Sequence, residues 1–306
     1  IDIANYNAVG GSTILFSGHY PRFHVSDFQV RTLDNVGVDW PLTYDDLAPH
    51  YRANEIFLGV SGLAGDPMYP DTMDHLLQPI TMGRAGKTLA NAMNKKGWHW
   101  WPSYSAILPF QLGNRGGCTL DGLCNAGCHN GAKGSADVSF VADALTAGLD
   151  LRTRATVLRV ITKHNKAKGV EYINSEGVID KVYGKKIILA ANAIGTLRIL
   201  WNSFQGNDFL GNRSRQVGRN FMIHPLGYVE GVLPGQQDAC FGPQGSWLAS
   251  HEFYETDESR GFRRGYSMHF LKGYGPVDTA FNSFVRRKLA LGTDSLVTKI
   301  RDQIKG

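Results

Sequence analysis

The chain has 306 residues, of which 42% are hydrophobic, 11% aromatic and 19% charged, and this composition excludes a disordered or a fibrous protein. The formal net charge is +5, but the basic residues are scattered, so we expect a solvated basic surface rather than a nucleic-acid-binding face. The apolar runs fall short of the ~18 residues that a membrane-spanning helix needs. The length suits one large domain or two interleaved ones.

The first part of the chain is expected to contain a glycine-rich turn followed by two helices. Thr13–Phe16 is expected to form a short helix or a buried turn. The apolar pattern predicts a helix from about Tyr44 to Leu58, with acidic residues in its first turn and Gly59 as its stop. A second helix is predicted over about Gly86–Lys96. An aromatic cluster follows, and its expected role is packing in the core or in a lid: Trp98, Trp100, Trp101 and Tyr104.

The middle of the chain changes from irregular to regular structure. The segment 116–135 is rich in glycine, cysteine and asparagine and is expected to be irregular, and a helix is predicted from Ser139 to Ala147. A strand, a β-meander and a returning strand follow. The returning strand, 187–191, is a short continuous apolar run, which is typical of a buried parallel strand. A helix is then predicted from about Thr196 to Ser203.

The sequence beyond Arg219 indicates an antiparallel sheet. Long strands are predicted over 221–234 and 261–273, and the second of these is expected to pair with 246–256 across a turn at 257–261. The residues from about 277 onward are expected to be helical.

Small residues recur at two places where a backbone could lie against a ligand. The first is Gly10–Thr13, followed by Arg22, where N–H groups and two hydroxyls can donate hydrogen bonds to a phosphorylated ligand. The second is a pair of expected strand ends, 155–157 and 190–192, because nucleotide-binding sheets hold ligands at the carboxyl ends of parallel strands. Each pattern by itself is also typical of an ordinary turn.

Three cysteines fall within eleven residues, at Cys118, Cys124 and Cys128. Thiolates at this C-x5-C-x3-C spacing can ligate a metal ion or an iron–sulfur cluster. Three other interpretations stay open. The cysteines are packing residues, two of them form a disulfide, or they bind zinc together with His129.

Taken together and in this order, the motifs resemble the glucose–methanol–choline (GMC) oxidoreductase family. The resemblance covers nearly all of residues 5–228. It runs through GGSTILFSGHYPR, GVDWPLTYDDLAPHYRANEIFLGVSG, CNAGCHNGAKGS, ATVLRV, IILAANAIGTLRILWNS and VGRNFMIHP. Within the family the sequence is similar to gluconate 2-dehydrogenase large subunits and to other bacterial FAD-dependent sugar dehydrogenases.

The resemblance implies an α/β fold, in which an incomplete Rossmann-like FAD-binding core is interleaved with a mostly antiparallel α+β substrate domain. The expected parts are an FAD-binding segment at 1–30, a helical or lid segment at 31–115, an FAD-binding segment with a β-meander insertion at 116–228, and an incomplete substrate-binding domain at 229–306. The family pattern also has a GxGxxG fingerprint, expected upstream of residue 1, and a catalytic histidine, expected beyond Gly306. We therefore expect a fragment that lacks both ends and assign no catalytic residue within it.

The activity implied is dehydrogenation of a CH–OH group of a sugar, sugar acid, polyol or alcohol, with hydride transfer to the flavin N5 and electrons passed to an acceptor other than NAD. An oxidase that reduces O₂ and a non-catalytic metal-binding fragment are the alternatives. The cysteine spacing is similar to that of the three-iron four-sulfur cluster in bacterial FAD glucose dehydrogenases, with Thr119 in place of an adjacent cysteine. A cytochrome or a small subunit is then an expected electron-accepting partner.

Carried over residue by residue, the resemblance assigns FAD contacts at nine positions. Phe16 and Ser17 stand where many family members have Asn-Gly beside the flavin ring. Lys133 either faces the cofactor or is a surface lysine, and His224 is expected to be structural. The remaining contacts are Gly10, Gly11, Ser12 and Thr13 along the flavin and diphosphate, Val157 at the adenine, and Ala191 and Asn192 at the ribose and diphosphate.

Overall fold

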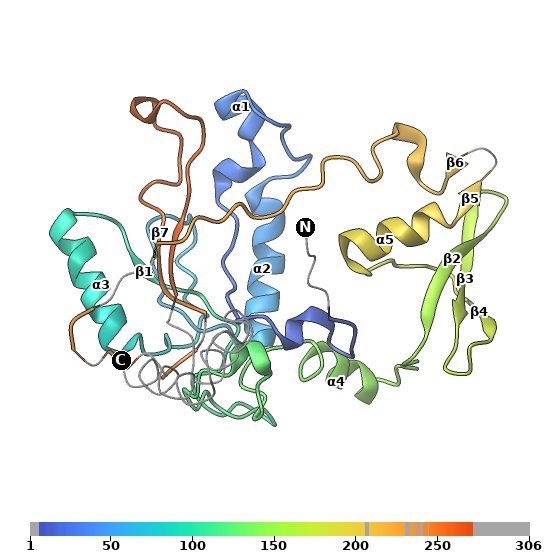
Figure 1. Ribbon diagram of the computed structural model, residues 1–306, viewed down its shortest axis with the longest axis horizontal. Helices are drawn as coiled ribbons and strands as arrows, with labels where there is room; N and C mark the ends of the chain where they lie inside the picture. Colours follow the sequence, from blue (N-terminus) through green and yellow to red (C-terminus); the bar gives the residue numbers. More distant parts are fainter. Residues whose placement is uncertain are drawn as a thin grey trace, which may run out of the picture. The chain divides into compact units, whose positions relative to one another are not determined.

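A computed structural model describes residues 6–205, 208–229, 233–235, 237–238, 241–243 and 245–271. The chain forms two compact units (Figure 1). The larger unit contains residues 1–147 and 232–306, and the smaller unit contains residues 148–231. No helix of the described part is long and apolar enough to cross a membrane. The segment boundaries expected at residues 30, 115 and 228 stay predictions.

The larger unit has four described helices, of which the last three lie close to their predicted positions and the first was not predicted. They are α1 (Val30–Asp34), α2 (Tyr44–Leu58), α3 (Gly83–Lys96) and α4 (Phe140–Thr146), with 3₁₀ turns at Gly11–Ile14, Val25–Phe28, Cys124–Ala126 and Glu258–Arg260. Helix α2 has the predicted bounds because Thr43 and Asp46 form a capping box at its start, and Gly59 ends it with φ 70°. Helix α3 begins three residues before the predicted Gly86.

The sheet of the larger unit is antiparallel, as predicted. Its strands are β1 (Trp101–Pro102), β7 (Ser246–Ser250) and β8 (Met268–Leu271), in the order β1-β7-β8. Ala249 of β7 is the register partner of both Trp101 and His269. The predicted pairing is confirmed, but the strands are shorter than expected, because the chain between Ser250 and Met268 forms a long irregular connection.

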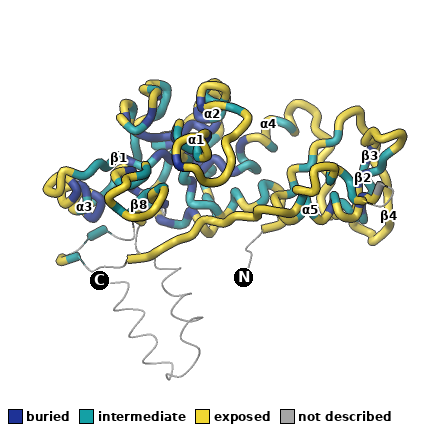
Figure 2. Tube along the Cα trace, turned by 90° about the horizontal axis from the view of Figure 1, so that it is seen from above, coloured by how far each residue is buried: buried dark blue, intermediate teal, exposed yellow. Residues whose placement is uncertain are grey.

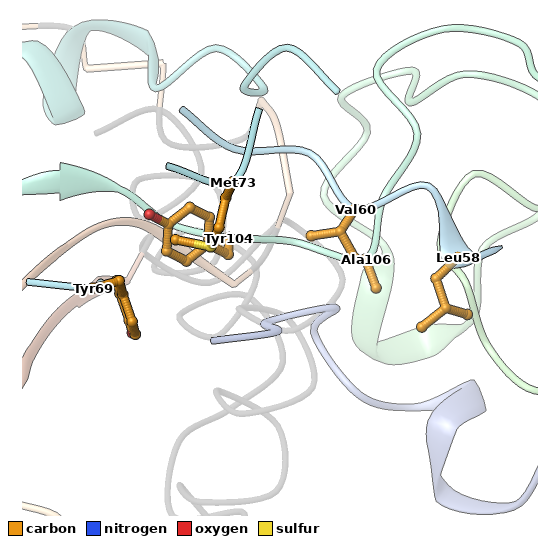
Figure 3. Close-up of a cluster of buried hydrophobic side chains, with 6 residues drawn as sticks. All are labelled: Leu58, Val60, Tyr69, Met73, Tyr104 and Ala106. Carbon is orange, nitrogen blue, oxygen red and sulfur yellow. The ribbon is translucent and has the colours of Figure 1, made fainter. Parts of the chain in front are cut away.

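The core of the larger unit lies between α2 and the sheet segment that contains β1. Buried positions concentrate around α2 and α3 (Figure 2). Six buried side chains form one hydrophobic cluster (Figure 3): Leu58, Val60, Tyr69, Met73, Tyr104 and Ala106. Gly62 lies so close to this cluster that an added Cβ atom would stand 2.4 Å from Cδ1 of Tyr104. The predicted packing role of Tyr104 is therefore confirmed.

The smaller unit is a meander with one covering helix. Strands β2 (Thr156–Lys163), β3 (Lys166–Ile173) and β4 (Ile179–Tyr183) pair antiparallel in this order, and α5 (Asn192–Trp201) contacts β2. A two-stranded ribbon of β5 (Phe204–Gln205) and β6 (Asp208–Phe209) follows. The predicted meander is confirmed. Helix α5 begins four residues before the predicted Thr196.

Two predicted strands are wrong. The segment 187–190 is in no strand, and Ile188 is 85% exposed rather than buried. A parallel strand exists only where a parallel neighbour binds its backbone, and the described strands of the smaller unit pair only antiparallel. The segment 221–229 is likewise unpaired, with Met222 85% exposed. The helix predicted from about residue 277 lies outside the described residues.

Candidate cofactor site

The glycine turn of the larger unit leaves one backbone face open. Gly10 and Gly11 have φ angles of 91° and 57°, which glycine adopts without steric cost. A Cβ atom at Gly10 would approach the Cβ and the backbone N of Asp137 to 3.0 Å, whereas a Cβ atom at Gly11 would meet nothing within 4 Å. Gly10 is therefore packed against the protein, and Gly11 is the position at which a ligand can approach the backbone.

The two hydroxyls of the predicted turn stabilise the turn itself. The Thr13 hydroxyl donates to the carbonyl of Gly10 and accepts a hydrogen bond of 2.9 Å from the backbone N–H of Ala136. The Ser12 hydroxyl accepts from the backbone N–H of Tyr6 at 3.2 Å. The segment that carries Ala136 and Asp137 thus holds the turn at Gly10 and Thr13, and the side of the turn at Gly11 stays open.

Lys133 is buried and binds the backbone of the turn. It is 1% exposed, so the surface-lysine interpretation is wrong. Its ammonium group donates to the carbonyls of Ile14 at 2.6 Å, Phe16 at 2.8 Å and Cys124 at 2.5 Å. Burial lowers the pKa of this ammonium group, and the three carbonyls supply its hydrogen bonds. The charge of Lys133 therefore fixes the chain beside the turn.

The three cysteines gather on the other side of Lys133. Cys124 is buried with Ile107 and Ala132, and Cys118 and Cys128 pack against that cluster. All three are free thiols, so the disulfide interpretation has no support among them. The Cys128 thiol donates to Oδ1 of Asn130 at 3.1 Å. Burial raises the pKa of the Cys118 thiol.

The cysteine loop, which lies wholly in the described part of the chain, presents no site for a single metal ion as folded. Within the described residues, no group of three or more His, Cys, Asp or Glu side chains is placed to hold a metal ion. His129, the fourth ligand of the zinc interpretation, is exposed and pairs with Asp121 at 3.2 Å between Nδ1 and Oδ2. The donor chemistry is present, but the arrangement of the donors is that of packing residues.

The predicted contacts of the smaller unit lie on β2 and at the start of α5. Val157 is near the beginning of β2, so the expectation that a strand ends there is wrong; the preceding residues, 150–155, form no strand. Asn192 has φ 55°, and its Oδ1 accepts from the backbone N–H groups of Ile194 and Gly195 at 2.9 and 3.0 Å. Asn192 therefore caps the first turn of α5.

Sequence reasoning missed the buried cations that organise the larger unit. Arg22, which follows the glycine turn, is 5% exposed and binds Glu55 instead of a ligand. Arg115 donates to the carbonyls of Leu58, Gly131 and Ala132 at 2.8 to 3.0 Å. No periodic pattern marks such residues. The sequence gives one signal for Lys133. It stands in a run of small residues, Gly131 to Ser135, and small neighbours allow other segments to pack closely around its side chain.

Comparison with known proteins gives one family. The model of the family described as GMC oxidoreductase matches residues 3–226. A 2-methyl-1,2-propanediol dehydrogenase from Mycolicibacterium austroafricanum is 36% identical over 284 residues, which cover 90% of this chain and 51% of that protein.

Two further relatives match over most of the chain. Paromamine 6′-oxidase from Streptomyces fradiae is 31% identical, over 74% of this chain and 42% of that protein. The fructose dehydrogenase large subunit from Gluconobacter japonicus is 27% identical, over 71% of this chain and 41% of that protein. The chain thus spans about half the length, or less, of the curated relatives it matches.

Proposed function

Because this chain belongs to the GMC oxidoreductase family, we propose that the protein carrying it is an FAD-dependent dehydrogenase that oxidises a CH–OH group of an alcohol, polyol, sugar or sugar acid. Two of the named relatives are dehydrogenases, of a propanediol and of fructose. The observation that carries the proposal is the turn at Gly11, where an open backbone face is held in place by buried contacts behind it.

The residues of the larger unit suit the flavin half of FAD. Gly11 leaves its backbone accessible, and Gly10, Ser12 and Thr13 give the turn its shape. Lys133 binds the carbonyls of Ile14 and Phe16, and Phe16 and Ser17, which follow directly, are proposed to lie beside the flavin. When bound, FAD supplies the group that accepts a hydride. The chain's own contribution is to bind and orient that group.

The residues proposed for the adenosine half belong to the smaller unit. They are Val157 on β2, and Ala191 and Asn192 at the start of α5. Oδ1 of Asn192 already accepts hydrogen bonds from two backbone N–H groups. The hydrogen bonds that Asn192 makes to FAD are therefore proposed to come from its backbone or from its side-chain amide nitrogen. We assign no catalytic base within this chain.

The electron acceptor is proposed to be other than NAD, with a cytochrome or small subunit as the partner. The alternative is an oxidase that reduces O₂. We keep it because one of the relatives is named as an oxidase. No electron-transfer step is assigned to the cysteines, because the described residues show no metal-ion site among them. For the same reason a metal-binding role without catalysis has no support in the geometry.

The test is anaerobic reduction of the purified protein, expressed from its full open reading frame. We expect an absorbance spectrum of oxidised flavin, bleached within the mixing time by one of a panel of diols, polyols, sugars and sugar acids. Readmission of air then separates the two acceptors, because an oxidase regains the spectrum with peroxide formation and a dehydrogenase needs an added dye. A protein that contains no flavin and takes none up from added FAD would refute the proposal.

A further inference from the structure

A small cavity with several polar residues in its lining lies inside the larger unit. Its volume is about 10 Å³, and it lies where β1 and the end of β7 meet the first segment of the chain. Four of its polar lining residues come from four separate segments: His19, Asp66, Tyr104 and His251. Asp66, Tyr104 and His251 are 2%, 5% and 7% exposed, so solvent does not reach them from outside.

Five polar atoms around this cavity have no hydrogen-bond partner within the described part of the protein. They are both ring nitrogens of His19, Oδ2 of Asp66, the hydroxyl of Tyr104 and Nδ1 of His251. The second carboxylate oxygen of Asp66 is already bound, by Nε2 of His99 and by the backbone N–H of Met68, both at 3.0 Å. A buried polar atom without a partner is costly, and five around one cavity are far more than chance packing leaves.

The composition of the lining selects what can bind. The Tyr104 hydroxyl is a donor, Oδ2 of Asp66 is an acceptor, and a neutral imidazole offers one of each. A metal cation would satisfy only the acceptors, and an anion would be repelled by the Asp66 carboxylate. Water donates and accepts, and a volume of about 10 Å³ is what the centre of one water molecule needs.

We propose that this cavity is a binding site for one buried water molecule, which joins Tyr104, Asp66, His19 and His251 in a single hydrogen-bond network. The water accepts from Tyr104 and donates to Oδ2 of Asp66, and Nδ1 of His251 and one ring nitrogen of His19 supply its other two partners, so four of the five atoms gain a hydrogen bond. The site connects the segment after the glycine turn, the loop that follows α2, the segment after β1 and the end of β7. It therefore adds a side-chain network to segments that backbone hydrogen bonds already join, such as Tyr20 N–H to the carbonyl of Tyr104 and the β1–β7 pairing.

The direct test is a high-resolution crystal structure of the protein together with its metal content. We expect one water peak within hydrogen-bond distance of Oδ2 of Asp66 and the Tyr104 hydroxyl, and no metal in stoichiometric amount. A cavity without density, or one that holds a metal ion, would overturn the proposal.

Tyr104→Phe tests the same network in solution, because the substitution removes only the hydroxyl. If the hydroxyl binds a water, the variant unfolds at a lower urea concentration, by a shift comparable to that of Tyr69→Phe. Tyr69 is the matched control, since its ring packs 5.8 Å from that of Tyr104 and its hydroxyl donates to the carbonyl of Arg22 at 3.2 Å. If the Tyr104 hydroxyl has no partner, Tyr104→Phe leaves the midpoint unchanged or raises it, and the water site is ruled out.

Discussion

Arg22 and Glu55 form a two-point ion pair in the interior of the larger unit. Nε of Arg22 lies 2.7 Å from Oε1 of Glu55, and Nη2 lies 2.6 Å from Oε2. The two side chains are 2% and 3% exposed. Tyr44 and His75 add hydrogen bonds of 2.8 and 2.6 Å to the pair. Through this pair α2 is attached to the segment that follows the glycine turn.

Removing one member of this pair is expected to be strongly destabilising. Arg22→Met leaves the Glu55 carboxylate buried without its cation, and we expect the free energy of unfolding to fall by about 3–5 kcal/mol. The double variant Arg22→Met/Glu55→Met should lose much less than the sum of the two single variants, because no charge stays buried alone. Urea denaturation of the three variants measures this coupling, and additive losses would show that the pair does not act as a unit.

Lys133→Met tests whether a buried cation fixes the glycine turn. Three carbonyls lose a charged donor, so we expect a loss of about 3 kcal/mol or more in the free energy of unfolding. The Cys124 thiol is buried in the unaltered protein, and we expect it to react faster with a thiol reagent in the folded Lys133→Met variant. Lys163→Met, at an exposed position at the end of β2, is the control and should change neither quantity. Equal thiol reactivity in both variants would contradict an anchoring role.

Gly11→Ala separates cofactor binding from folding. The substitution places a methyl group in open space at φ 57°, so we expect a stability loss of only about 1–2 kcal/mol from the backbone conformation. We expect FAD affinity, measured by flavin fluorescence, to fall about tenfold or more. Gly177→Ala introduces the same kind of strain at φ 79°, also with nothing within 4 Å, in the turn before β4. FAD affinities that are equal in the two variants would exclude Gly11 as a contact.

Stability is expected to fall on mild acidification because of buried histidines. Burial lowers the pKa of His19 to about 4 and that of His251 to about 3, with His269 and His24 respectively adding repulsion. Since the unfolded imidazole titrates near 6.5, the unfolded state binds more protons below that pH. The stability that the neutral histidines contribute is therefore fully present above pH 6.5. It is lost as the pH falls towards 4, at about 1.4 kcal/mol per pH unit for each histidine.

The measurement is the urea midpoint between pH 6.5 and 5, a range in which exposed carboxylates titrate little. His251→Gln removes one titrating group and should flatten the profile. His164→Gln, at an exposed position in the turn between β2 and β3, should leave the slope of the profile as it was. A midpoint that does not change over this range in the unaltered protein would contradict the buried, neutral state of these rings.

Local sequence signals predicted the elements that local interactions stabilise. Helix α2 was predictable in full, because its capping box and its terminal glycine lie within the helix sequence or next to it. The hairpin-like turn around Asn174–Val178 made the β-meander predictable in the same way. The apolar run 187–191 misled the prediction, because an apolar run specifies burial only where a partner strand covers it.

The tertiary contacts of the candidate site were beyond the sequence. The glycines indicated a turn, but nothing in the pattern distinguished Gly10, packed against Asp137, from the open Gly11. Lys133 acts through carbonyls of residues more than a hundred positions away, and sequence spacing carries no information about such a contact. The cysteine spacing predicted ligand chemistry, yet the positions of the sulfur atoms depend on how the whole loop packs.

The carbonyl contacts of Lys133 and Arg115 have a consequence for the order of folding. Lys133 reaches Ile14 across 119 residues, and Arg115 reaches Leu58 across 57. Closing such long loops costs chain entropy before the contact contributes any stability, so we expect these hydrogen bonds to form late in folding. Weakening them should therefore hasten unfolding and leave the refolding rate unchanged. We accordingly expect the lifetime of the glycine turn to depend on how slowly Lys133 releases the carbonyls of Ile14 and Phe16.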